Sequence, residues 1–273
     1  LYGLRESPRV FSEFLAECLK AIGFTRSVAE PQLYFSDSGA LIVAHVDDLI
    51  VTCADGEWDA LKKAIEGKVP MKWTGEVVHG SWSEFLGRQY TRLGAARTSG
   101  FAARSPPEYY AQLAGLVGLG GANAVSLPYG QVPATYEDSS AALGVAMSAT
   151  YRTAVGRCLW KAPARPDVQY AVKELARDVS AHTQESWGQL KKLVRYLRGS
   201  GSHVLCLRVG APCEEKAEPE CVLQITCDAS WGNAPGYKST SGGVLSMDGF
   251  LLSSWSRTQT VSAQSSAEGE LIA

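Results

Sequence analysis

The stretch at residues 41–52, LIVAHVDDLIVT, constrains the fold of this chain more than any other. Two apolar, β-branched runs flank a pair of adjacent aspartates, a pattern typical of a tight hairpin with Asp47 and Asp48 at or near its tip. An ordinary aspartate-rich turn would explain the pair, because aspartate favours turns over strand interiors. The alternative is a divalent-metal site for phosphoryl transfer. In that case the apolar flanks would hold two like charges on a buried sheet, where cations must neutralise them.

The composition is that of a folded protein. Of the 273 residues, 45% are hydrophobic, which is enough for a sizeable core and excludes a wholly disordered chain. No apolar run approaches the roughly 18–20 residues that span a bilayer, so we predict no membrane partner. The seven cysteines form no C-x-x-C pair, and scattered reduced thiols predict an intracellular protein, cytoplasmic or nuclear. Because the chain begins with Leu1 and ends inside an expected helix, we expect a piece of a longer protein.

Charge and linker composition divide the chain into three modules. Residues 111–212 are net basic, whereas residues 1–110 and 213–273 are net acidic. A Gly/Pro-rich stretch at 115–133 and an acidic stretch at 210–220 have the composition of connectors. We therefore predict an α+β chain with modules at 1–110, 111–212 and 213–273.

Two amphipathic helices are expected in the basic module. The first begins near Pro166 and runs to about Ser180, and the second begins after Thr183 and ends at Gly199. Basic residues near a helix C-terminus complement the helix dipole without any partner. They could also follow the phosphate backbone of a duplex, which is the alternative interpretation. The second helix carries four such cations opposite its apolar face: Lys191, Lys192, Arg195 and Arg198.

The last module has the pattern of a strand, a hairpin and a helix. Residues 222–228 alternate and deliver Asp228 near the end of a strand. Asp248-Gly249 is a strong turn signal between two further strands within 241–256. Ser265 and Glu268 form an S-x-x-E capping box at the start of the helix, which gives Glu268 a structural task.

Several of these segments together resemble a known family. In chain order they are LYGLRESPRVFSEFL, HVDDLIVT, FLG, YRTAVGRCLW, ARPDVQYAV, LKKLVRYLRGS, CDASWG and SSAEGEL. They are similar to segments of the Pol polyprotein of copia-type LTR retrotransposons, in the C-terminal part of its reverse transcriptase and the start of its ribonuclease H. The resemblance implies a partial reverse-transcriptase palm with a helical thumb or connection region, followed by the N-terminal part of a ribonuclease H-like fold.

The same resemblance assigns candidate catalytic residues and ligands of Mg²⁺ or Mn²⁺. Asp47 is expected to bind the polymerase metals, with Asp48 contributing less directly. Asp228 and Glu270 match the first two carboxylates of ribonuclease H. The implied activity is RNA-directed DNA synthesis with hydrolysis of RNA in a hybrid, by metal-dependent phosphoryl transfer. The alternative is a catalytically inactive nucleic-acid-binding remnant of such an element.

The resemblance also implies partners and shows three departures. The partners are an RNA template, an RNA/DNA hybrid, deoxynucleoside triphosphates and the remaining polyprotein domains, and the four cations of the second helix would contact nucleic acid. His45 stands where the family usually has tyrosine, and Gly269 replaces the usual alanine. The third polymerase aspartate of the family lies on a strand before LYGL, so we expect an incomplete polymerase site in these 273 residues.

Overall fold

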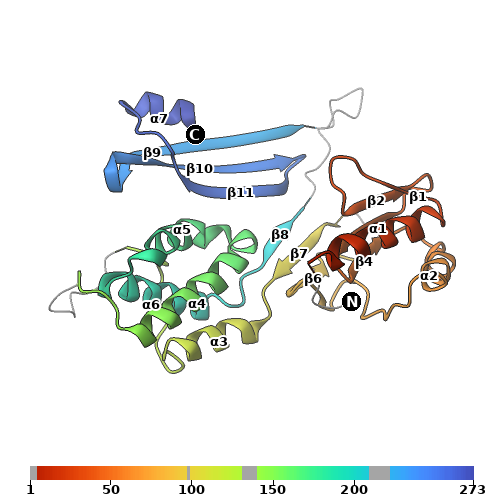
Figure 1. Cartoon of the computed structure of the whole chain (residues 1–273), viewed down its shortest axis with the longest axis horizontal. Helices are drawn as coiled ribbons and strands as arrows, with labels where there is room; N and C mark the ends of the chain where they lie inside the picture. Colours follow the sequence, from red (N-terminus) through yellow and green to blue (C-terminus); the bar gives the residue numbers. More distant parts are fainter. Residues whose placement is uncertain (1–4, 97–98, 131–139, 209–221) are drawn as a thin grey trace. The chain divides into compact units, whose positions relative to one another are not determined.

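The computed structural model describes residues 5–96, 99–130, 140–208 and 222–273. The chain forms two compact units, one of residues 1–76 with 84–86 and one of residues 77–83 with 87–273. Helices and antiparallel sheets occur in separate stretches of these units, as an α+β chain requires (Figure 1). The division into three modules stays a prediction, and the predicted linker at 210–220 lies outside the described residues.

The first unit is a four-stranded antiparallel sheet with two helices. The strands pair in the order β1-β2-β3-β4. On β3 the side chains of Ile42 and Ala44 are buried, and those of Leu41 and Val43 on the other face are exposed. The buried side chains form one cluster with Leu15 of α1 and other apolar residues of both helices. The elements are α1 (Ser7–Lys20), β1 (Phe24–Arg26), β2 (Leu33–Ser36), β3 (Leu41–His45), β4 (Asp48–Thr52) and α2 (Trp58–Glu66).

The second unit begins with a small sheet and a helical core. In the sheet, β7 pairs antiparallel with both β6 and β8, which brings residues 101–104 beside residues 205–207. The apolar stripes of the helices meet in one buried cluster that includes Tyr151, Leu175 and Leu190. The elements are β6 (Arg88–Arg92), β7 (Phe101–Arg104), α3 (Pro107–Leu116), α4 (Val145–Lys161), α5 (Gln169–Arg177), α6 (Gln184–Gly199) and β8 (Leu205–Leu207). The short strand β5 (Ser83–Phe85) precedes them, and its residues 84 and 85 are assigned to the first unit.

The two predicted helices of the basic module are confirmed. Thr183 caps α6 by accepting a hydrogen bond from the backbone N–H of Ser186, and the helix ends at Gly199. The first predicted helix is a 3₁₀ turn from Pro166, then α5, then another 3₁₀ turn that ends at Ser180. No described helix has the length and apolarity that a bilayer crossing requires.

Buried Arg165 fixes the start of α5 to the end of α6. Its guanidinium, 4% exposed, donates to both carboxylate oxygens of Asp167 at 2.8 and 2.7 Å. It also donates to the Ser200 carbonyl at 3.2 Å. Burial raises the pKa of Asp167, but the hydrogen bonds and the charge of Arg165 outweigh this effect, so the pKa is lowered overall.

A second sheet and a short helix form the C-terminal part of this unit. The strands pair antiparallel in the order β11-β10-β9, and α7 packs on β9 and β10. Asp248 and Gly249 have φ angles of 49° and 78°, so the predicted two-residue hairpin turn is confirmed. A 3₁₀ turn at Pro235–Tyr237 joins the first two strands. The elements are β9 (Leu223–Ala234), β10 (Lys238–Met247), β11 (Phe250–Thr258) and α7 (Ser266–Ile272).

Candidate functional site

The Asp47–Asp48 pair lies at the tip of the β3–β4 hairpin, as predicted. His45 and Asp48 are the last paired residues of the ladder, so Val46 and Asp47 form the turn. Val46 adopts a φ of 55°, a left-handed conformation that is costly for a β-branched residue. A two-residue hairpin turn usually has glycine where φ is positive. With valine at that position, the backbone of the turn is strained.

Both aspartates are exposed, so the argument that the apolar flanks would hold the two charges on a buried sheet is wrong for this hairpin, and the alternative of an ordinary turn stays open. The buried face of β3 ends at Ala44, and His45, Asp47 and Asp48 lie beyond it. The apolar side chains of the flanks alternate, so only one face of the hairpin is covered. Water therefore solvates the carboxylates, and their mutual repulsion does not by itself require a cation.

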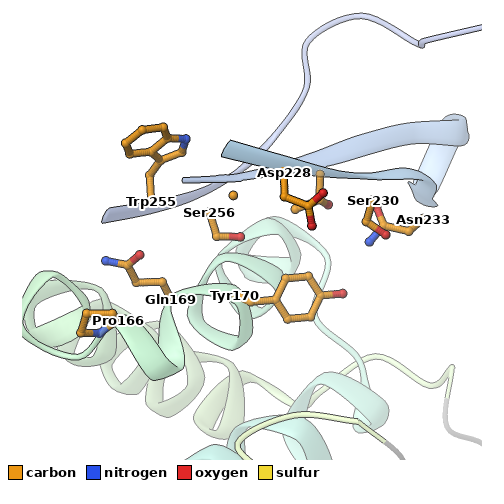
Figure 2. Close-up of a pocket in the computed structure, with 10 residues that line it drawn as sticks. Pro166, Gln169, Tyr170, Asp228, Ser230, Asn233, Trp255 and Ser256 are labelled. Atoms are coloured by element: carbon orange, nitrogen blue, oxygen red, sulfur yellow. The ribbon is translucent and has the colours of Figure 1, made fainter. Parts of the chain in front are cut away.

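Asp228, in the second unit, is also exposed, but it lies beside a hollow of the protein. It pairs with Gly242 of β10 and lines a cavity of about 430 Å³ between the β9–β11 sheet and the start of α5. Figure 2 shows its carboxylate on the side of the sheet that faces α5, where the ring of Tyr170 lies across from it. The strand thus delivers the predicted carboxylate into a hollow of the protein.

Polar side chains of α5 hold this sheet in place. The Gln169 amide donates to the Ser254 carbonyl at 3.1 Å and contacts its hydroxyl at 3.0 Å. The Lys173 ammonium donates to the Thr240 hydroxyl at 3.0 Å and forms an ion pair with Glu174. The two walls of the cavity are therefore joined on strands β10 and β11.

Glu270 lies on α7, exposed to solvent. Gly269 beside it is buried, and a Cβ at this position would be in ordinary van der Waals contact with Ala263 and Ala229, at 3.8 and 3.9 Å, so the usual alanine would fit. Figure 1 draws α7 and α5 on opposite sides of the β9–β11 sheet, and Glu270 does not line the cavity that contains Asp228. The catalytic roles of both carboxylates stay predictions.

The predicted N-cap of α7 by Ser265 is confirmed, but the reciprocal bond of a capping box is not formed. The Ser265 hydroxyl accepts from the Glu268 N–H at 3.2 Å, and the Glu268 carboxylate accepts from the Gln264 N–H at 2.6 Å. The carboxylate thus bonds one residue earlier than an ideal capping box would place it.

The donor chemistry suits a magnesium ion, but the donor number does not. Aspartate and glutamate supply the oxygen ligands that Mg²⁺ prefers, in near-octahedral geometry. Across the described ranges, no three His, Cys, Asp or Glu side chains form a group that could hold a metal. These residues do not make a complete metal site, and no reaction step is derived through one.

The four cations of α6 are not equivalent. The Arg195 guanidinium donates to the Asn123 carbonyl at 2.7 Å, and that of Arg198 donates to the Ala122 carbonyl at 2.6 Å. Lys191 and Lys192 are partly exposed, and the Lys191 ammonium lies 5.7 Å from the Trp187 ring. The arginines thus fasten the loop after α3 to α6, a task that helical spacing does not reveal.

Sequence reasoning also missed the α5 wall of the cavity. Tyr170 is 41% exposed and lies off the apolar stripe of α5. An exposed aromatic residue on the polar side of an amphipathic helix was the available signal. Its partner surface comes from residues far away along the chain, so periodicity gave no means of finding it.

Comparison with known proteins identifies the relatives of this chain. No protein-family model matches it. It is 27% identical over 274 residues to the "Retrovirus-related Pol polyprotein from transposon RE2" of Arabidopsis thaliana. The matched region covers 99% of the chain and 18% of the polyprotein. It is 26% identical over 288 residues to the corresponding polyprotein from transposon TNT 1-94 of Nicotiana tabacum, covering 100% of the chain and 20% of that protein.

A shorter relative matches as well. The "Putative transposon Ty5-1 protein" of Saccharomyces cerevisiae is 27% identical over 252 residues, 90% of the chain and 76% of the relative. The chain spans about a fifth of the length of the Pol polyproteins that it matches. The resemblance predicted from the sequence is therefore confirmed: over nearly its whole length the chain is similar to the Pol polyproteins of copia-type retrotransposons.

Proposed function

We propose that this chain is part of a retrotransposon Pol polyprotein and contributes to an RNA-directed DNA polymerase with ribonuclease H. The observation that carries the proposal is the similarity to Pol polyproteins over 99% of the chain. The first unit would be part of the polymerase palm, the helices a thumb or connection region, and the C-terminal sheet with α7 the start of a ribonuclease H-like domain. RNA template, RNA/DNA hybrid and deoxynucleoside triphosphates would be the partners, with the remaining polyprotein domains.

In this proposal the two pairs of candidate carboxylates serve different active sites. Asp47 and Asp48 at the exposed hairpin tip would contribute ligands to the Mg²⁺ or Mn²⁺ of the polymerase. Asp228 and Glu270 would do the same in ribonuclease H. Because the described residues supply only part of each ligand set, we expect the 273-residue chain alone to show neither primer extension nor hybrid cleavage.

The test compares the 273-residue chain with an extended protein made from the native open reading frame. In Mg²⁺ buffer, the extended protein should extend a DNA primer on an RNA template. Asp47→Asn should lower the rate at least 100-fold, and Asp37→Asn, at another exposed turn of the same sheet, should leave it unchanged. Robust extension by the 273-residue chain, or an active Asp47→Asn variant, would contradict the assignment.

A second arm of this test addresses ribonuclease H. In the extended protein Asp228→Asn and Glu270→Gln should abolish cleavage of a labelled hybrid, whereas Glu268→Gln should only weaken the α7 cap. If Glu268→Gln abolished cleavage and Glu270→Gln spared it, the catalytic glutamate would have been placed two residues too late.

The alternative, an inactive remnant, is favoured by one observation. The described residues bring no three metal-binding side chains together. A remnant would bind nucleic acid but would catalyse nothing in the extended protein either. The salt dependence of hybrid binding shows whether the α6 lysines contact phosphates or only water. If they contact phosphates, Lys191→Ala should reduce the slope of log affinity against log salt concentration by about one unit. Arg198→Ala should mainly lower the stability of α6 and its loop.

A further inference from the structure

One buried side chain connects α7 to the sheet that carries Asp228. Gln259 directly follows β11, and 5% of its surface is exposed. Its amide nitrogen Nε2 donates to the Gly269 carbonyl of α7 at 2.8 Å and to the Ser241 hydroxyl of β10 at 3.0 Å. A single amide therefore bonds both the helix and the sheet.

These two bonds end beside the candidate ribonuclease H carboxylates. Gly269 immediately precedes Glu270 in α7. Ser241 immediately precedes the residue of β10 that pairs with Asp228 in the antiparallel ladder. The Gln259 amide thus joins two segments of the chain, each of which lies next to the backbone of one candidate carboxylate.

The packing of α7 at this point does not fix its position by shape. The residues that meet where the helix lies on the sheet are the small ones Gly269, Ala229 and Ala263. Small residues allow a close approach, but they have no projecting side chains that could interlock. Hydrogen bonds have narrow limits of distance and angle, so the bonds from Gln259 fix the position that this smooth contact leaves open.

Stability alone does not explain an amide at this place. The side-chain oxygen Oε1 of Gln259 is buried, and among the described residues it has no hydrogen-bond partner. An unpaired buried polar atom destabilises a fold, whereas an apolar side chain of similar volume, such as methionine, would avoid that loss. The two donated bonds are therefore what the glutamine provides.

We propose that Gln259 is a positioning residue of the ribonuclease H site: its amide sets where α7, and with it Glu270, stands relative to the strand of Asp228. This inference rests on the proposed ribonuclease H function and adds a residue outside its carboxylate set. Small displacements of a catalytic group slow a reaction strongly. Loss of the two bonds should therefore slow cleavage without weakening the binding of the hybrid.

The first experiment measures the position of α7 without any activity. A Cβ at Gly269 would lie 3.9 Å from that of Ala229, so the pair Ala229→Cys and Gly269→Cys has a separation that a disulfide bridges. The pair is made in a Cys227→Ser background, because Cys227 is an exposed thiol two residues away on the same face of β9. In the 273-residue chain, Gln259→Met should slow formation of this disulfide about tenfold, the factor expected for the loss of one buried hydrogen bond. Gln264→Met, at an exposed glutamine just before α7, is the matched control and should leave the rate unchanged.

The second experiment measures cleavage of a labelled RNA/DNA hybrid by the extended protein. Gln259→Met should lower kcat about tenfold or more and change KM by less than about twofold. Ser241→Ala, which removes one of the two bonds, should have a smaller effect in the same direction. Forming the disulfide between positions 229 and 269 in the Gln259→Met protein should restore most of the lost kcat, and a reducing agent should reverse that rescue. Circular dichroism melting checks that each variant is folded at the assay temperature.

The outcomes separate this inference from the proposed function. In an extended protein that cleaves the hybrid, an unchanged kcat in Gln259→Met, or a loss that the disulfide does not reverse, would overturn the inference and leave the function intact. Equal rates of disulfide formation with and without the amide would overturn it as well. A lower melting temperature with an unchanged kcat per folded molecule would give Gln259 a structural role only and overturn it too. An extended protein without cleavage would overturn the proposed function, and the inference with it.

Discussion

The chain contains two antiparallel sheets that present candidate carboxylates, and the two sheets are covered in different ways. In the first unit Ile42 has 0% of its surface exposed, because the side chains of α1 and α2 pack on that face. In the second unit Ile225 of β9 is 60% exposed, and polar bonds to α5 hold the sheet on its other face. Alternating apolar residues thus predict which side chains share a face, but they do not reveal what covers it.

The largest expected effect is on stability, and it comes from shortening one isoleucine in each sheet. Only the sheet in which that side chain is buried should lose much stability. Ile42→Ala should destabilise the first unit by about 3 kcal/mol, because it leaves a cavity in a closed core. Ile225→Ala should cost less than about 0.5 kcal/mol, as surface substitutions do. Hydrogen exchange of the β3 and β9 peptides in increasing urea measures both. Equal costs would mean that the β9 face is covered in solution.

A smaller effect is expected where polar bonds hold the second sheet. Gln169→Ala should lower the opening free energy of β11 by about 1 kcal/mol, because the Ser254 hydroxyl and carbonyl lose a partner. The first unit should not respond. Gln112→Ala, on the exposed side of α3, is the matched control. Unchanged exchange in β11 would show that the sheet does not depend on this amide.

The two hairpin turns offer a test with opposite signs. Val46→Gly should stabilise the β3–β4 hairpin by about 0.5–1 kcal/mol, because glycine adopts a φ of 55° without the steric cost of valine. Asp248→Gly should not stabilise the β10–β11 hairpin, since the Asp248 carboxylate accepts a hydrogen bond from the Val222 N–H at 2.9 Å. The thermal unfolding temperature of each variant, compared with that of the unchanged chain, measures these effects. A destabilised Val46→Gly variant would show that the turn is not strained.

The smallest expected effect lies at the end of α7. Glu268→Gln should cost about 0.5 kcal/mol, because a neutral amide replaces a charged acceptor of the Gln264 N–H. Glu270→Gln should cost nothing measurable in stability, since its side chain is exposed. Exchange of the α7 amides distinguishes the two. A larger loss for Glu270→Gln would reveal an unrecognised structural contact of that carboxylate.

Local chemistry determined several elements of this protein. Aspartates between two apolar runs placed the β3–β4 hairpin, Thr183 and Gly199 bounded α6, and Asp248-Gly249 specified the second turn. Each of these signals acts over a few residues, through backbone conformation or a hydrogen bond to a neighbour. The residue types and their spacing were therefore sufficient to predict these elements.

Contacts between distant residues determined the rest. Periodicity placed Arg195 and Arg198 on a polar face of α6, but only the packed loop at 119–123 shows that their guanidinium groups bind backbone carbonyls. The strand pattern delivered Asp228, but the wall that faces it comes from Tyr170, 58 residues earlier in the sequence. The exposure of the aspartate pair likewise depends on where the buried face of β3 ends. Such features arise when elements pack, because burial and hydrogen-bond partners belong to the assembled fold and not to any one segment.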